Sequence, residues 1–351
     1  MLEFVNLPLP ANLVLFAVAA VVVLFAGDRL SRYADTISGI TGIGHATMGL
    51  MLLAGVTSLP EIAVTVTATL DGHSILALNN LFGSIAMQVA LLAAVDFTVG
   101  RRPLTAVVPE PAVMLEGSLN ILLLAIVACG MVVGDMLFLG AGLWAWACLL
   151  GYVVSAWILS SEEGRVPWVV ARRGEPEHSL IDEVESYRDP RGREAPLQPV
   201  IYKTALVAAA IVIAGFVVAR SGEAIAEQTG LGENFIGFVL VAISTSLPEA
   251  STALAAARHG HFIMAVSDIL GTNLLNVGLV FLIDILSAGQ PVLTAAGTFP
   301  TFGALLAIVL LALFLAGLTE RVEKQVFRLG YNSIAVLAIY CGGLMLLFQL
   351  R

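Results

Sequence analysis

Apolar residues run in long stretches along nearly the whole chain, and polar residues gather mainly between these stretches. Runs of about 20 apolar residues are typical of helices that cross a bilayer, whereas a transmembrane β-barrel would show short alternating segments. The pattern therefore predicts an all-α polytopic membrane protein with ten transmembrane helices, at residues 9–27, 40–70, 74–97, 110–134, 136–160, 201–221, 233–257, 262–286, 295–318 and 328–350.

A polar segment at residues 161–200, rich in Glu, Arg, Pro and Gly, divides the predicted helices into two groups of five. We interpret residues 1–160 and 201–351 as two repeats, and 161–200 as a cytoplasmic hydrophilic linker. The stretch RVPWVVARR within the segment has two readings, a membrane-surface helix or a solvated linker, and the linker is favoured.

Lysine and arginine are distributed unevenly between the two sides of the predicted bundle. With the N-terminus outside, fifteen of the 17 basic residues fall in inner loops, and the outer side keeps only Arg220 and Arg351. Basic residues favour the cytoplasmic side. We therefore expect a multi-pass protein of the cell (inner) membrane with both termini extracytoplasmic.

The amino-acid composition supports the assignment to a membrane and limits the classes of partner that the protein is expected to bind. Hydrophobic residues make up 58% of the chain and charged residues 12%, about half the usual charged content of soluble domains. No basic stripe with interleaved aromatic residues points to nucleic acid. The expected partners are the lipid bilayer and cations as substrates, with no cofactor, and a monomer is compatible with this plan.

An internal repeat is the strongest organisational signal. Adding 188 to a position between Gly42 and Asp96 gives its counterpart in the second half without a gap, so TSLPE at 57–61 recurs at 245–249. Because five predicted helices separate the copies, the second copy is inserted upside down. Inverted repeats with broken helices, here the second and seventh, are a recurring plan of secondary transporters that hold substrate near the midplane.

Each TSLPE motif places oxygen-bearing groups on one wall of a bent helix. Pro60 and Pro248 remove a backbone donor, so each motif is expected to break its helix. Helical spacing puts Glu61 on the face of Thr57, Ser58 and Ala54. The second copy repeats this face with Ala242, Thr245, Ser246 and Glu249, and the next helix of each repeat adds Ser84 with Gln88 and Thr272 with Asn276. Oxygen ligands without histidine or thiolate favour a hard cation such as Na⁺ or Ca²⁺ over zinc or copper.

Energetics favours a functional role for the two glutamates. An acid at mid-bilayer costs roughly 2.5–3.5 kcal/mol, and the predicted cores of these helices contain no lysine or arginine. The glutamates must therefore be protonated, cation-bound or open to water, as an exchanger requires. Pro-kinked packing helices are the structural alternative. An intramembrane hydrolase with Ser58 or Ser246 as nucleophile is disfavoured, because every histidine falls in or near a predicted loop; we expect no enzyme.

Two further acids, Asp96 and Asp284, are also related by the repeat. They lie twelve residues beyond Ser84 and Thr272, about 18 Å along a helix. This spacing puts them near opposite membrane surfaces, where we expect interfacial solvation, with an entry vestibule as the alternative.

At the doubled TSLPE motif, with GS at 83–84 and GTN at 271–273, the sequence resembles the calcium/cation antiporter superfamily, most closely its microbial sodium/calcium exchanger family. The likeness covers nearly the whole chain. It implies Ca²⁺ export against Na⁺ or H⁺ by alternating access, with the first and sixth helices sliding against the bundle. A Na⁺/H⁺ or Ca²⁺/H⁺ exchanger on the same scaffold is the alternative.

The resemblance also implies roles for the site residues. Glu61 and Glu249 would be the central ligands, with oxygens from Thr57, Ser58, Thr245, Ser246, the carbonyls of Ala54 and Ala242, and from Ser84, Thr272, Gln88 and Asn276. Gln88 is longer than the asparagine typical of the family, and Asn276 stands where relatives can carry a third carboxylate. With only two acids expected, the site balances one Ca²⁺ or two monovalent cations, which makes two-for-one exchange or proton coupling competitive with exchange of three Na⁺ for one Ca²⁺.

Overall fold

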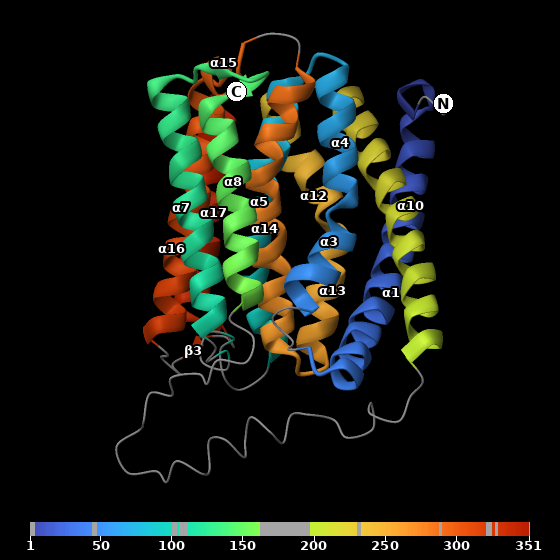
Figure 1. Ribbon diagram of the computed structural model, residues 1–351. Coiled ribbons are helices and arrows are strands. Elements are labelled where there is room, and N and C mark those ends of the chain that lie inside the picture. Colours follow the sequence, from blue (N-terminus) through green and yellow to red (C-terminus); the bar gives the residue numbers. More distant parts are fainter. Residues whose placement is uncertain are drawn as a thin grey trace.

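The computed structural model describes residues 4–43, 48–99, 104, 108, 111–161, 197–229, 233–287, 290–320, 325–326 and 329–350. In this part of the chain, long helices stand side by side in a bundle, and most of them run along its long direction (Figure 1). The predicted segment 161–200, including the RVPWVVARR stretch, lies outside the described residues except for Ser161 and the first residues of a helix that begins at Leu197.

The first half of the chain begins with a single 3₁₀ turn, η1 (Phe4–Asn6). It continues with α1 (Leu9–Thr41), the π-helical segment η2 (Met48–Leu53), α3 (Ala54–Thr57), α4 (Leu59–Leu70), α5 (Ser74–Val99), α7 (Pro111–Val133), the strands β1 (Leu137–Phe138) and β2 (Ala141–Gly142), and α8 (Leu143–Ser161).

The second half contains α10 (Leu197–Thr229), α11 (Glu233–Phe235), the π-helical η4 (Ile236–Val241), α12 (Ala242–Thr245), α13 (Leu247–Arg258), α14 (Phe262–Leu286), α15 (Val292–Ala295), α16 (Thr298–Glu320), β3 (Gln325–Val326), β4 (Leu329–Gly330) and α17 (Tyr331–Leu350). Adding 188 to the bounds of α1, η2, α3, α4 and both strands of the first half gives the bounds of their counterparts in the second. The offset seen in residues 42–96 therefore extends to elements on both sides of that range.

Eight described helices are long and apolar enough to cross a membrane, and the number is ten if each of two bent helix pairs counts as one span. This agrees with the predicted helical membrane architecture. The predicted spans 9–27 and 201–221 are shorter than the helices observed there, because α1 and α10 are each 33 residues long in total. In α1 the extension is amphipathic: Leu30 and Ala34 are buried, while Asp28 on the other face pairs with Arg32 and His259, both at 3.1 Å. A prediction based on apolar runs places the end of the helix where such charged residues begin, although the helix itself continues.

Two short β-hairpins stand between helices of this all-α fold. Two antiparallel hairpins, β1–β2 and β3–β4, join α7 to α8 and precede α17. Each strand has only two residues, which is too short for an alternating pattern to be visible in the sequence.

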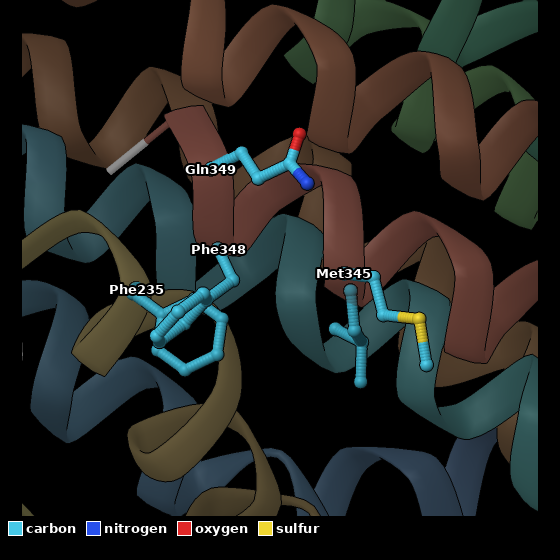
Figure 2. A pocket seen from close by; sticks show the side chains of 5 residues that line it. Phe235, Met345, Phe348 and Gln349 are labelled. Atoms are coloured by element: carbon cyan, nitrogen blue, oxygen red, sulfur yellow. The ribbon is translucent and has the colours of Figure 1, made fainter.

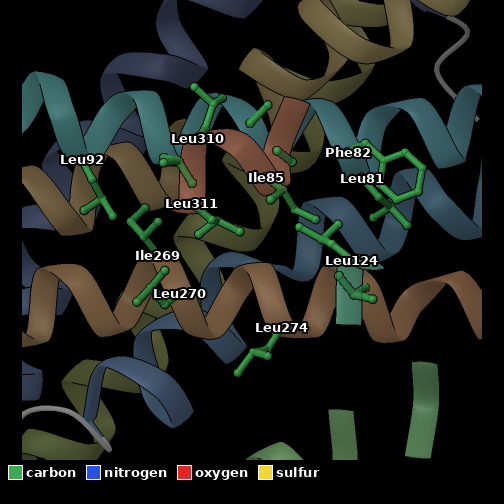
Figure 3. Close-up of a cluster of buried hydrophobic side chains, with 14 of the residues drawn as sticks. Leu81, Phe82, Ile85, Leu92, Leu124, Ile269, Leu270, Leu274, Leu310 and Leu311 are labelled. Carbon is green, nitrogen blue, oxygen red and sulfur yellow. The ribbon is translucent and has the colours of Figure 1, made fainter. Parts of the chain in front are cut away.

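The hydrophobic core lies around α5 and α14. The apolar windows of these two helices are 83% and 72% buried, against 22% for α1 and α10, so α5 and α14 are the innermost helices and α1 and α10 lie at the periphery. Figure 3 shows part of this core, built from side chains of α5, α14, α16 and α7: Leu81, Phe82, Ile85, Leu92, Ile269, Leu270, Leu274, Leu310, Leu311 and Leu124.

Glycines let the two halves cross at close range. A Cβ added to Gly83 of α5 would lie 2.0 Å from the carbonyl oxygen of Phe238 in η4, and one added to Gly271 of α14 would lie 3.0 Å from the Cα of Leu50 in η2. Small residues allow this approach of helix backbones in membrane proteins. The bent segment of each half is thereby packed against the inner helix of the other half.

Asp96 and Asp284 hold these crossed halves together, and the prediction that they are solvated at the interface is wrong. Both are buried. Asp96 accepts hydrogen bonds from the N–H groups of Leu104 and, at 2.8 Å, Gly330; Asp284 accepts them from Val292 at 2.6 Å and Gly142 at 2.8 Å. Each partner of Asp284 is related by the 188 offset to a partner of Asp96. The chain folds back over each helix end, so backbone donors replace water.

Candidate functional site: a buried pair of glutamates

Each TSLPE motif lies at a bend between two helical segments. The pair η2–α3 and α4 bends by 44° at Ser58, and the pair η4–α12 and α13 bends by 49° at Ser246. Pro60 and Pro248 occupy the first turn of α4 and α13, where the missing N–H is tolerated. Proline therefore starts a new helix at each bend.

This local geometry puts each glutamate at the start of a helix. Glu61 is in the first turn of α4 and Glu249 in the first turn of α13. The partial positive charge of a helix N-terminus favours a carboxylate there. The bend and the dipole thus help to keep an acid inside an apolar bundle.

The two glutamates come from opposite halves of the chain and interact electrostatically. Both are fully buried, their carboxylates repel each other electrostatically, and none of their four carboxylate oxygens has a hydrogen-bond partner of ordinary geometry among the described residues. The hydroxyl groups of Thr245 and Ser246 lie beside Glu61, and that of Thr57 lies beside Glu249. Each acid is therefore accompanied by hydroxyl groups of the opposite motif.

Side chains of the inner helices α5 and α14 also contact the TSLPE motif of the opposite half. Ser84 of α5 lies 3.3 Å, oxygen to oxygen, from Thr245, and the Gln88 amide donates a 3.1 Å hydrogen bond to the Ser246 hydroxyl group. On the other side, the Ser58 hydroxyl group lies 3.4 Å from that of Thr272 on α14.

All twelve residues singled out in the sequence are buried: Ala54, Thr57, Ser58, Glu61, Ser84, Gln88, Ala242, Thr245, Ser246, Glu249, Thr272 and Asn276. The Ala54 carbonyl oxygen is in use, since the Ser58 hydroxyl group donates to it at 2.6 Å. The Asn276 amide has no hydrogen-bond partner among the described side chains and backbone groups.

Sequence reasoning missed two residues of this region, Asp268 and Asn80. Asp268 of α14 is fully buried and interacts electrostatically with Glu249. Asn80, its counterpart at the 188 offset, accepts a 3.3 Å hydrogen bond from the Thr245 hydroxyl group. A third buried acid therefore lies near the two acids expected from the sequence. The signal was present, because Asp268 is an acid inside a predicted transmembrane helix, one turn before Thr272.

The region has three buried acids, and the described helices that carry its residues place no basic side chain near them. The helices α3, α4, α5, α12 and α14 contain no lysine or arginine, and α13 has only Arg258 at its far end. Among the described residues, no three His, Cys, Asp or Glu side chains converge on one point as a metal cluster. Hydroxyl, amide and carbonyl oxygens must therefore supply the other ligands of any bound ion, a set that suits hard cations.

Helix α10 covers both bends. A Cβ added to Gly215 would lie 2.6 Å from Cγ of Pro60 and 3.6 Å from Cγ of Pro248, so the two prolines meet at one point of this helix. On α1, Gly27 is the counterpart of Gly215 at the 188 offset and lies against Ser251 of α13. The two peripheral helices therefore contact the bent segments through their smallest residues.

A surface hollow at the end of α17 is chemically different. Its lining consists of Phe235, Leu344, Met345, Phe348 and Gln349 (Figure 2). The rings of Phe235 and Phe348 meet edge to face with centroids 5.4 Å apart. This lining contains no carboxylate or hydroxyl group, so the hollow offers a poor cation site.

Comparison with known proteins gives one consistent result. The sodium/calcium exchanger protein family matches residues 11–169 and 200–349. The chain is 27% identical over 268 residues to the inner membrane protein YrbG of Escherichia coli, covering 76% of this chain and 77% of YrbG. It is 24% identical over 319 residues to CaxA of Alkalimonas amylolytica, which is named as an antiporter, covering 90% and 94% of the two chains.

A third relative is the sodium/calcium exchanger MaX1 of Methanosarcina acetivorans, 31% identical over 144 residues, which cover 40% of this chain and 41% of MaX1. Among solved structures, the sodium-calcium exchanger NCX_Mj superposes with a TM-score of 0.68 at 16% identity, covering 95% of this chain and 98% of that one. This structural similarity establishes the shared fold.

Proposed function

Because this chain belongs to the sodium/calcium exchanger protein family, we propose that it is a secondary antiporter that moves Ca²⁺ across the membrane against Na⁺ or H⁺. The family relationship confirms the resemblance read from the TSLPE motifs, and it makes cations the substrates of a membrane-embedded exchanger.

One observation carries the proposed site. Glu61 and Glu249 are buried together without a basic partner among the described residues, and each is accompanied by hydroxyl groups of the opposite motif. Two carboxylates match the charge of one Ca²⁺, and their mutual repulsion is relieved when a cation binds between them. We assign the remaining ligands to Thr57, Ser58, Thr245, Ser246, Ser84, Thr272, Gln88, Asn276 and the carbonyl groups of Ala54 and Ala242.

Alternating access would follow from an inverted repeat. Element bounds that repeat at one offset support this plan, as does Figure 1, in which α1 and α10 run in opposite directions and α4 and α13 occupy opposite ends of the bundle. In this plan α1 and α10 move against the bent segments, with Gly27 and Gly215 at the sliding contacts. Both termini would face away from the cytoplasm in an inner membrane, as the distribution of basic residues indicates.

The hydrolase alternative gains no support. The Ser58 hydroxyl group donates to the Ala54 carbonyl oxygen, and Ser246 accepts from Gln88. Of the described histidines, His259 and His261 pair with Asp28 and Asp35 of α1, at the turn between α13 and α14. Neither serine therefore has a histidine base among its hydrogen-bond partners in the described part of the chain.

The test is transport by purified protein in liposomes. We expect ⁴⁵Ca²⁺ uptake driven by an outward Na⁺ gradient or by a pH gradient, and the effective gradient identifies the coupling ion. Flux is expected to disappear in Glu61→Gln and Glu249→Gln and to persist in Ser58→Ala. Glu116→Gln makes the same change at another buried glutamate, on α7, and serves as the matched control. Full transport by both motif variants would refute the site.

Na⁺/H⁺ exchange on the same scaffold is the second candidate, and the three buried acids without basic partners favour it as much as they favour Ca²⁺. It predicts ²²Na⁺ flux under a pH gradient with no ⁴⁵Ca²⁺ flux under either gradient.

A further inference from the structure

Asp268 is a buried carboxylate that the pair of glutamates leaves unexplained. One of its oxygens accepts a hydrogen bond from the Thr252 hydroxyl group of α13, and the other, Oδ1, has no hydrogen-bond partner among the described residues. The side chain is fully buried. A buried carboxyl group must be protonated or be compensated by a positive charge, and the described helices around Asp268 supply no basic side chain to it.

Glu249 connects Asp268 to the glutamate pair. Glu249 interacts electrostatically with both Glu61 and Asp268. Among the described residues, however, the three acids do not form one cluster that could hold a single metal ion. They define two neighbouring positions, one between Glu61 and Glu249 and one between Glu249 and Asp268.

Oxygen atoms gather at the second position. The Thr252 hydroxyl oxygen lies 3.2 Å from the carbonyl oxygen of Pro248 and 3.1 Å from that of Glu249, and it also contacts the Asp268 carboxylate. Carboxylate, hydroxyl and carbonyl oxygens are the ligands of hard cations.

The other repeat has no equivalent charge. Asn80 occupies the related position on α5, and its side-chain oxygen accepts a hydrogen bond from Thr245. An asparagine at position 268 would likewise accept the hydrogen bond of Thr252. Aspartate and asparagine can therefore both accept this hydrogen bond. What the aspartate adds at position 268 is a negative charge.

We propose that Asp268, with Thr252 and Glu249, forms a second cation position next to the one between the two glutamates, and that it takes a monovalent hard cation, Na⁺. One added carboxylate adds one negative charge, so charge balance favours one monovalent ion over a second divalent ion. This inference rests on the proposed function, because Glu249 is shared by both positions.

The test counts bound ions rather than transport. Detergent-purified protein is saturated with ²²Na⁺, and the bound Na⁺ per chain is measured for the natural protein and for Asp268→Asn, which keeps the side-chain shape and the acceptor for Thr252. We expect the variant to bind one Na⁺ fewer per chain. Asp284→Asn makes the same change on the same helix, where Asp284 binds backbone N–H groups instead, and is expected to keep the full number.

An unchanged Na⁺ count in Asp268→Asn overturns the inference, and so does a natural protein that binds no Na⁺. The flux assay with the glutamate variants separates this failure from failure of the antiporter proposal. Normal exchange that depends on Glu61 and Glu249, together with an unchanged count in Asp268→Asn, refutes only the second position. Loss of one bound Na⁺ in a protein that exchanges no cation refutes only antiport.

Discussion

Replacing Glu61 by glutamine tests whether the buried glutamates hold the cation. The change keeps the size of the side chain but removes one of the two charges that repel each other. Removing one partner of a buried, paired charge costs about 3–5 kcal/mol. At 1.4 kcal/mol per tenfold change, Ca²⁺ affinity should fall roughly 100- to 4,000-fold.

The same change should not destabilise the protein without Ca²⁺. Glu61 makes no hydrogen bond of ordinary geometry in the described structure, and it repels Glu249, so removing its charge relieves an unfavourable interaction. The variant should therefore unfold at the same temperature as the natural protein, or higher, when no Ca²⁺ is added. This separates a ligand role from a structural role, which would lower that temperature.

Thermal unfolding in detergent, with and without Ca²⁺, measures both effects. At a Ca²⁺ concentration 100 times the dissociation constant, the natural protein gains about 2.7 kcal/mol of stability. If Glu61→Gln raises that constant 100-fold, the gain falls to about 0.4 kcal/mol at the same concentration. Glu116→Gln should retain the full gain. A gain in Glu61→Gln equal to that of the natural protein would refute the reasoning.

Two further predictions concern the framework around the site. Asp284→Asn removes one of the two oxygens that accept from Val292 and Gly142, and it should lower the free energy of unfolding by about 1.5–3 kcal/mol while leaving the Ca²⁺-induced gain intact; an unchanged unfolding temperature would contradict this. Gly215→Leu forces a side chain against the prolines of both bends and should cost about 1–3 kcal/mol and strongly slow ⁴⁵Ca²⁺ flux. Gly342→Leu on α17, where an added Cβ meets nothing within 4 Å, should leave flux unchanged, and equal effects of both variants would rule out a specific contact.

Much of the architecture could be predicted because a bilayer restricts the chain to a few local solutions. Backbone groups in lipid must be satisfied within each segment, so long apolar runs are helices. The doubled motif likewise marked Glu61 and Glu249 as unusual, since acids are costly at membrane depth. Family membership was also readable from these residues, and the family match confirms it.

Some errors arose where contacts between distant segments override local pattern. Asp96 lies near the end of an apolar helix, so its sequence suggests an acid at the water interface. Its hydrogen-bond donor Gly330 is more than 200 residues away along the chain. No pattern in the sequence indicates that the backbone N–H of Gly330 lies next to Asp96. The hairpins were not predicted because each strand is too short to show an alternating pattern. The charged ends of α1 and α10 were not predicted because they are amphipathic rather than continuously apolar.

The sequence by itself determined which segments are helical, where they bend, and that two acids lie at the bends, because these follow from hydrophobicity, proline and the repeat. Only the tertiary structure decided that the halves interlock. Glycines at Gly83 and Gly271 let each bent segment approach the inner helix of the other half. That approach brings Glu61 of one half beside Glu249 of the other, and electrostatic interaction between side chains depends on their separation in space rather than along the chain.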